Sequence, residues 1–178
     1  MKKLVLVMAA ILVIGYYIYF FVPAPSKKSP PPQSKISEEV HFHAGFLVYV
    51  DGKRVDLSDN KYMHIEPCEV EGIDKPTHTP REEQLEKAHL HNNIGNVAHV
   101  HVNGAKWGDL FTNINFRFEE GKEYAGFING IENQDILNAP IKEYSSALFI
   151  IGNNQGIDKN AVVSKEEIEA AEAKSESC

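Results

Sequence analysis

Apolar and polar residues alternate along much of the chain from Glu38 onwards, and a period of two is typical of β-strands with one buried face. Residues 40–50 alternate in this way, Asp51-Gly52 follows, and residues 53–57 continue the pattern. Because Asp-Gly favours the positive φ angles of a type I′ turn, the segment predicts a β-hairpin. One face of its first strand should carry Phe42, Ala44, Phe46, Val48 and Val50.

Further strands are predicted at residues 115–118, 124–128 and 147–151, with Asn129-Gly130 as another turn. No repeat of solenoid length is present. The predicted fold class is α+β: a small, strand-dominated domain of hairpins with one or two short helices, covering residues 38–152.

Helical patterns are fewer and shorter. One helix should begin after Thr79, because Pro80 suits the first helical position and Glu82 completes a capping box, and it should run to about Ala88. A second short helix is expected across residues 107–111.

Residues 153–178 are rich in Asn, Gly, Glu and Ala. Ser164 and Glu167 can cap a helix here, but this helix has almost no apolar face. We therefore expect residues 153–178 to form an acidic, polar and exposed helical tail.

The N-terminus has a different pattern, since residues 4–22 form an uninterrupted apolar and aromatic run after Lys2 and Lys3. Such a helix is roughly 28 Å long, which is about the thickness of the hydrocarbon core of a bilayer. A cleavable signal peptide ending near Ala24 is the alternative, but the run is longer than a usual signal-peptide core and Pro25 follows. We expect residues 1–22 to be a signal anchor that crosses the membrane once.

The two flanking lysines favour a cytoplasmic N-terminus, which places the rest of the chain outside the cytoplasm, at the cell membrane. Residues 23–37 are rich in Pro, Ser and Lys and predict an extended linker. None of the 25 acidic residues precedes Glu38, whereas five of the 18 basic residues do. A body this acidic repels phosphate backbones, so nucleic acid is excluded as a partner.

Histidine carries the candidate chemistry. Six of the eight histidines form three His-x-His pairs, whereas random placement would give roughly 0.3 such pairs. In a strand, residues i and i+2 project from one face about 6.6 Å apart. Each pair therefore presents two imidazoles to one side; the pairs are His41/His43, His89/His91 and His99/His101.

The two later pairs fit a hairpin with an odd-numbered loop, such as residues 94–96 with Gly95 or Asn96 in the left-handed conformation. In that register, His89 faces His101 and His91 faces His99, with all four rings on one side of the sheet. The opposite side then carries Leu90, Ala98, Val100 and Val102.

Three or four neutral imidazoles at this spacing are typical ligands of Zn²⁺, Cu²⁺ or Ni²⁺, and ligand type alone does not choose among these metals. The predicted ligands are His89, His91, His99 and His101, with His41 and His43 added if their strand neighbours the hairpin. Two alternatives are a polar, solvent-facing surface and a pH-responsive cluster, since histidine titrates near pH 6.5.

His64, Glu66 and Cys68 form a second set of possible outer ligands at i, i+2 and i+4. The set is similar to part of the zinc-deaminase signature, but Glu71 stands where that signature needs a second cysteine. The alternative is a buried Cys68 with His64 and Glu66 at the surface. Cys68 and Cys178 can form a disulfide outside the cytoplasm, or Cys178 can link two chains, and the sequence does not decide.

The function that these observations favour is membrane-anchored, extracytoplasmic binding of a divalent transition metal, for capture, buffering or hand-over. One alternative is a metal-dependent hydrolase or lyase with a His-ligated ion and an activated water. Another is an interaction module without metal, whose protein partner the sequence does not identify. Binding ranks above catalysis because no acid or base stands within the predicted hairpin.

The histidine pairs and the Trp107-Gly-Asp-Leu-Phe segment together resemble a group of short membrane-anchored bacterial proteins for which no activity is established. The resemblance covers roughly residues 40–152 and implies a membrane anchor but no particular reaction. The predicted order of elements is also similar to β-grasp folds, an analogy that concerns architecture alone.

Overall fold

A computed structural model describes residues 39–64 and 79–175, which belong to one compact unit. The strands are β1 (Glu39–Val50), β2 (Lys53–Arg54), β3 (Ala88–His89), β4 (Val97–Val102), β5 (Tyr124–Ile128), β6 (Ile131–Glu132) and β7 (Ser146–Ile151). The helices are α2 (Pro80–Leu85), α3 (Trp107–Asn113), α4 (Lys165–Ser175) and the short 3-10 turns η1 (Asn60–Tyr62) and η2 (Ile136–Asn138). The expected α+β class with a predominance of strands is confirmed.

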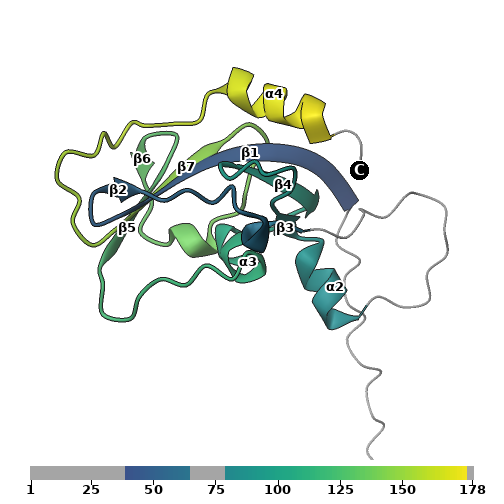
Figure 1. Cartoon of the computed structure of the whole chain (residues 1–178), viewed down its shortest axis with the longest axis horizontal. Helices are drawn as coiled ribbons and strands as arrows, with labels where there is room; N and C mark the ends of the chain where they lie inside the picture. Colours follow the sequence, from purple (N-terminus) through teal and green to yellow (C-terminus); the bar gives the residue numbers. More distant parts are fainter. Residues whose placement is uncertain (1–38, 65–78, 176–178) are drawn as a thin grey trace, which may run out of the picture. The chain divides into compact units, whose positions relative to one another are not determined.

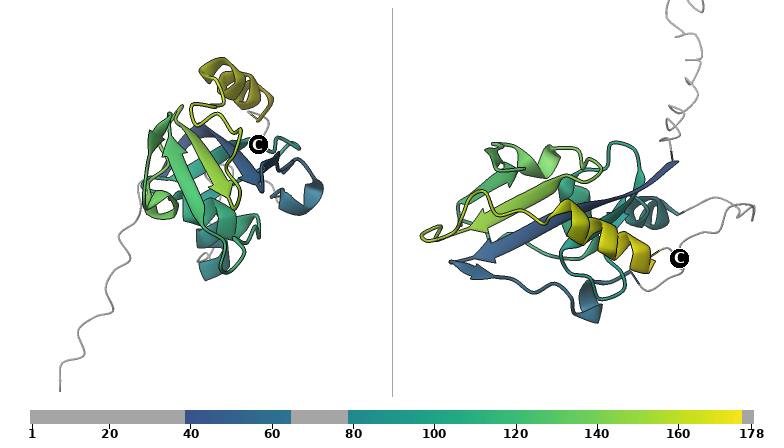
Figure 2. Two further views of the ribbon diagram at one scale, coloured as in Figure 1. Left: turned by 90° about the vertical axis from the view of Figure 1, so that its left-hand side faces the viewer. Right: turned by 90° about the horizontal axis from the view of Figure 1, so that it is seen from above.

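The strands form one mixed sheet in the order β3-β4-β1-β7-β5-β6, with β2 paired to β1. The central strands β1 and β7 are parallel, whereas the other pairs are antiparallel. Helix α4 covers one face of the sheet and α3 lies on the other, as the views in Figures 1 and 2 show. The sheet therefore has two covered faces, and the side chains alternate between them.

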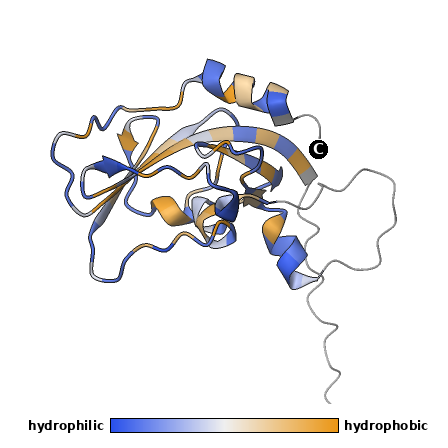
Figure 3. Cartoon of the chain, in the orientation of Figure 1, coloured by the Kyte–Doolittle hydropathy of each residue, from blue (hydrophilic) through white to orange (hydrophobic). Residues whose placement is uncertain are grey.

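The first hairpin is confirmed, with Asp51 and Gly52 at φ values of 48° and 80° between β1 and β2. The predicted apolar face of β1 packs in the core on the α3 side, and Figure 3 shows the alternation of hydrophobic and hydrophilic positions along this strand. Asn129 and Gly130 also adopt positive φ, as a tight turn between β5 and β6 requires.

Helix α2 begins as predicted, because the Thr79 side chain accepts from Glu82 N and the Glu82 carboxylate accepts from Thr79 N. It ends at Leu85, three residues before the expected end at Ala88, since Ala88 already belongs to β3.

The Trp107-Gly-Asp-Leu-Phe segment forms α3 and has a structural role. Trp107, Leu110 and Phe111 are buried in the core. Asp109 accepts from Lys106 N at 3.0 Å and from Lys87 Nζ at 2.9 Å, which ties the start of α3 to the residue preceding β3. Asp109 therefore holds the start of α3 against the residue that precedes β3.

The strand expected at residues 115–118 is wrong. Asn115 has a positive φ of 52° just after α3, and residues 116–119 have no strand partner. The rings of Phe116 and Phe118 instead pack against Phe111, with centroids 5.5 and 5.0 Å apart. The alternation of Phe116 and Phe118 therefore reflects an aromatic cluster around Phe111 and not one face of a strand.

The expectation of an exposed C-terminal tail is also wrong for α4. Ile168 is fully buried and Ala171 nearly so, and both pack against Leu47 and Ile150 of the sheet. The preceding segment is fixed by Val163 N, which donates to Ser146 Oγ at 2.8 Å. Ile168 and Ala171, three positions apart, are thus the buried residues through which this helix docks.

Val163 also explains why β1 contains a glycine. A Cβ added at Gly45 would lie 2.4 Å from Val163 Cβ, so only glycine lets the segment before α4 approach the sheet this closely.

The predicted anchor at residues 4–22 and the linker at residues 23–37 lie outside the described residues. Within residues 39–64 and 79–175, no helix combines the length and the apolar character that a bilayer crossing requires.

Candidate metal centre

Three adjacent strands bring the histidine pairs to one face of the sheet. His43 on β1 lies opposite His99 on β4, and His89 on β3 also lies opposite His99. The strand of His41 and His43 thus neighbours the strand of His99 and His101, which the sequence alone did not establish. Because Val97 packs under α4 and alternates with His99 and His101, the histidines share the α4 face of the sheet.

The predicted pairing of His89 with His101 and of His91 with His99 is wrong by two residues. β3 is only two residues long, and its register places Ala88 opposite Val100 and His89 opposite His99. A shift of two keeps each side chain on its expected face. Leu90 and Val100 accordingly lie in the core on the opposite side, as predicted.

The loop between β3 and β4 explains the shift. Its left-handed residues are Asn92 and Asn93, with φ values of 57° and 55°, and not Gly95 or Asn96. Gly95 has another role, because a Cβ there would lie 2.4 Å from the Leu57 carbonyl carbon. The loop therefore packs closely against the segment after β2. The alternation of apolar and polar residues does not predict this contact.

His64 joins the same cluster from outside the sheet. Its backbone N donates to Leu90 O at 2.7 Å, which places it beside β3, and its ring centroid lies 4.8 Å from that of His89. His64 is half-buried rather than a surface residue. Glu66, Cys68 and Cys178, also predicted as ligands or disulfide partners, lie outside the described residues.

We call the seven clustered residues the histidine cluster: His41, His43, His64, His89, His91, His99 and His101. His99 is its centre, since five other rings lie around it with centroids between 4.4 and 5.2 Å away. His43, His89 and His99 are almost completely buried, which is unusual for a titratable side chain. A merely polar, solvent-facing surface does not explain this burial.

The His89 ring has a fixed tautomer. Its Nδ1 atom lies 3.0 Å from the carbonyl oxygen of Leu85, at the end of α2, and this oxygen can only accept. Nδ1 therefore carries the proton and Nε2 has a free lone pair. A backbone carbonyl on the outer nitrogen is the usual support for a metal-ligating histidine.

Three buried nitrogens near this lone pair have no hydrogen-bond partner among the described residues: His89 Nε2, His99 Nε2 and His101 Nε2. One ring nitrogen from each of His89, His99 and His101 lies within 4.8 Å of the other two, and the same holds for His41, His43 and His99. Each unpartnered buried nitrogen costs about 1–3 kcal/mol. Both groups are close enough to hold a metal ion, which would satisfy these atoms.

Burial also sets the protonation of the cluster. It lowers the pKa of His89 to about 3 and the pKa of both His43 and His101 to about 4, because the charged form loses hydration and neighbouring imidazoles repel it. The pKa values of His91 and His99 are lowered for the same reason. These five rings are therefore neutral at pH 7, the form that coordinates metal ions.

A carboxylate that the sequence analysis missed borders the cluster. Glu172 of α4 lies 3.9 Å from His43 Nδ1 and accepts from the Tyr144 hydroxyl at 3.0 Å. Glu172 was not a candidate because residues 153–178 were expected to form an exposed tail. The available signal was its position four residues after Ile168, which places the two side chains on the same side of the helix.

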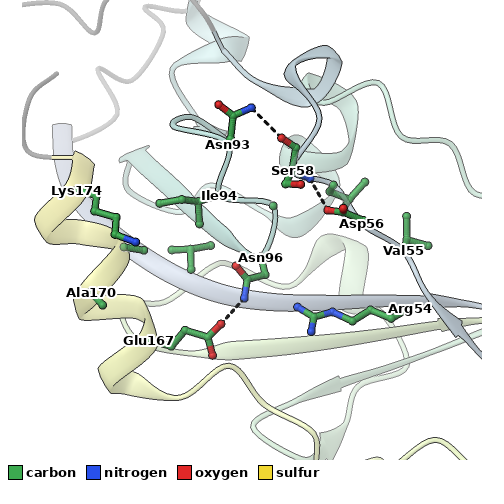
Figure 4. A pocket seen from close by; sticks show the side chains of 14 residues that line it. Arg54, Val55, Asp56, Ser58, Asn93, Ile94, Asn96, Glu167, Ala170 and Lys174 are labelled. Carbon is green, nitrogen blue, oxygen red and sulfur yellow. Dashed lines mark hydrogen bonds between the residues drawn. The ribbon is translucent and has the colours of Figure 1, made fainter.

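A hollow of about 570 Å³ lies between α4, the loop after β3 and the segment after β2 (Figure 4). Its polar groups include Arg54, Asn96, Glu167 and Lys174, and Asn96 Nδ2 donates to Glu167 Oε1 at 2.6 Å. None of the clustered histidines lines it. The hollow and the histidine cluster are therefore separate features that share the loop between β3 and β4.

The chain matches no known protein family, and neither a curated protein nor a solved structure is similar to it. Its function must therefore be inferred from the chemistry of the histidine cluster itself.

Proposed function

We propose that the protein binds a divalent transition metal ion, Zn²⁺, Cu²⁺ or Ni²⁺, in the histidine cluster. The observation that carries the proposal is the convergence of His89, His99 and His101, whose three buried Nε2 atoms lack hydrogen-bond partners among the described residues. Imidazole nitrogen suits all three metals, with bonds of about 2.0–2.1 Å for zinc.

The surroundings support binding rather than a bare polar surface. The Leu85 carbonyl orients His89, and burial keeps the rings neutral, so the site is prepared for a cation at neutral pH. Glu172 faces His43 and is held by Tyr144, which is the arrangement of a supporting carboxylate. We favour metal capture, buffering or hand-over over a hydrolase or lyase, because none of the clustered histidines lines the hollow beside α4 where a substrate could sit.

The proposal extends to location. A helix at residues 4–22 would anchor the chain to the cell membrane, and the linker at residues 23–37 would hold the metal-binding domain outside the cytoplasm. The resemblance to short membrane-anchored bacterial proteins agrees with this arrangement.

The sheet order, with parallel central strands β1 and β7, supports a β-grasp-like architecture for the domain.

The test uses the full-length chain in detergent, in the wild-type form and with His89→Gln and His101→Gln combined. Glutamine keeps size and polarity but removes two imidazoles. We expect the wild type to bind at least one of Zn²⁺, Cu²⁺ and Ni²⁺ in equilibrium dialysis and to melt at a higher temperature with the metal. The double variant should lose the ion held by His89, His99 and His101, together with the part of the thermal shift that this ion contributes.

Val102→Gln is the matched control, because Val102 neighbours His101 on β4 but points to the opposite face. This control should bind metal like the wild type. If the wild type binds none of the three ions and shows no thermal shift, the metal proposal fails and an interaction module without metal is the better interpretation.

A further inference from the structure

His99 uses its two ring nitrogens in two different surroundings. Its Nδ1 atom lies 3.1 Å from His43 Nε2 and is also approached by His91 Nε2. Its Nε2 atom is buried without a hydrogen-bond partner within the described part of the chain and belongs to the group of His89 and His101. The ring therefore lies between two sets of imidazoles, one at each nitrogen.

Hydrogen bonding alone does not satisfy both sides of this ring. A neutral imidazole has one N–H and one lone pair, and each nitrogen therefore serves one in-plane partner. Two nitrogens, from His43 and His91, approach Nδ1, which can pair with only one of them in either tautomer. Nε2 is unpartnered in either tautomer, because no donor or acceptor among the described residues is bonded to it.

We propose that the histidine cluster holds two metal ions and that His99 bridges them, with Nε2 on one ion and Nδ1 on the other. This inference rests on the proposed metal-binding function. The first ion is bound by His89, His101 and His99 Nε2. The second is bound by His41, His43, His91 and His99 Nδ1.

Distances support the second site. His41, His43 and His99 each offer a ring nitrogen within 4.8 Å of the others, and the His43–His99 separation is 3.1 Å. Two nitrogens on one tetrahedral zinc ion are about 3.3 Å apart, since each bond is about 2.0–2.1 Å. The separation of His43 Nε2 and His99 Nδ1 is thus close to that of two ligands on a shared ion.

Charge is the main cost of placing two dications close together, and two features offset it. Binding of the second ion releases the remaining ring proton of His99 to solvent, which leaves a bridging imidazolate with one negative charge. The Glu172 carboxylate lies 3.9 Å from His43 Nδ1 and supplies another. The imidazolate charge lies between the two ions, and the Glu172 charge lies beside the second ion, where the added positive charge has to be accommodated.

The experiment counts Cu²⁺ per chain on the full-length protein in detergent, by equilibrium dialysis followed by elemental analysis. We expect two ions in the wild type. One ion is expected when His89→Gln and His101→Gln are combined, and one when His41→Gln and His91→Gln are combined. Val102→Gln should retain two, and the melting temperature without metal checks that every variant is folded.

Electron paramagnetic resonance on the same samples tests the bridge. Two Cu²⁺ ions joined through one imidazolate should couple and lose the ordinary signal, and each double variant should show the signal of an isolated ion. Two uncoupled ions in the wild type would overturn the bridge. One ion in the wild type would overturn the two-ion site while leaving the proposed function intact, and no bound ion would refute both.

Discussion

The Glu172 carboxylate lies 3.9 Å from His43 Nδ1 while accepting a hydrogen bond from the Tyr144 hydroxyl. This contact joins the last helix to the histidine cluster. A carboxylate this close to the outer nitrogen of a ligating histidine favours the positive charge that a bound cation brings. Replacing Glu172 with Gln should therefore lower the affinity of the ion at His43 by about tenfold. Competition with a chelating dye measures this loss.

Glu169→Gln is the matched control, since Glu169 lies on the same helix, is half exposed and pairs with Lys165 at the surface. It removes the same charge from α4 without touching the cluster. Equal losses in the two variants would show that Glu172 acts through net charge and not through His43.

The histidine face could be predicted from the sequence because it follows from alternation. His89, His99 and His101 stand at even spacing, and any even register puts them on one side of a sheet. The exact register could not be predicted, because it depends on the loop packing of Gly95 against Leu57. That contact joins residues far apart in sequence and has no local signal.

The docking of α4 could not be predicted for a related reason. Its apolar contribution is Ile168 with a few alanines, too little for an amphipathic pattern. What fixes the helix is the complementary surface of Leu47, Ile150 and Phe127 on the sheet, together with Val163 before it. Only the folded sheet presents that surface, so Glu172 was missed as well.

Ile168→Ala tests the importance of this docking. Because Ile168 is fully buried, its truncation should lower the free energy of unfolding by about 2–5 kcal/mol. Urea unfolding of the metal-free chain measures the change. Ile131→Ala serves as the control, since Ile131 is 75% exposed and should cost less than about 0.5 kcal/mol. An unaffected Ile168→Ala variant would mean that α4 contributes nothing to the stability of the domain.

The free energy of unfolding of the metal-free protein should begin to fall near pH 6.5, which is a higher pH than the titration of carboxylates alone would cause. The pKa of His89 is about 3 in the folded state and near 6.5 when unfolded, so the unfolded state binds more protons between these values. Stability therefore falls as pH decreases from 6.5 towards 4, by up to about 1.4 kcal/mol per pH unit for each such histidine. Chemical denaturation at pH 7, 6 and 5 measures the slope, and His89→Gln should reduce it. A slope that this variant leaves unchanged would contradict the expected cause.

The topology can be tested with protease on intact cells. If residues 4–22 cross the membrane with the N-terminus in the cytoplasm, added protease should digest residues 38–178 without lysis. A chain beginning at Glu38 should be soluble and folded. Digestion only after lysis would show that the orientation is opposite to the predicted one.

Metal affinity should persist to lower pH at the buried histidine cluster than it would at a site of exposed histidines. Protons compete with metal ions only when the free imidazoles are protonated, and exposed histidines reach that point near pH 6.5. Burial lowers the pKa of His43 and His101 to about 4, so the folded site stays neutral well below pH 6. Affinity should thus change little between pH 7 and 5.5 and fall steeply as pH approaches 4. Zn²⁺ titration by calorimetry across this range measures it, with proton release counted in buffers of different ionisation enthalpy. A tenfold loss of affinity for each pH unit below 6.5 would mean that the ligands are exposed histidines and not the buried cluster.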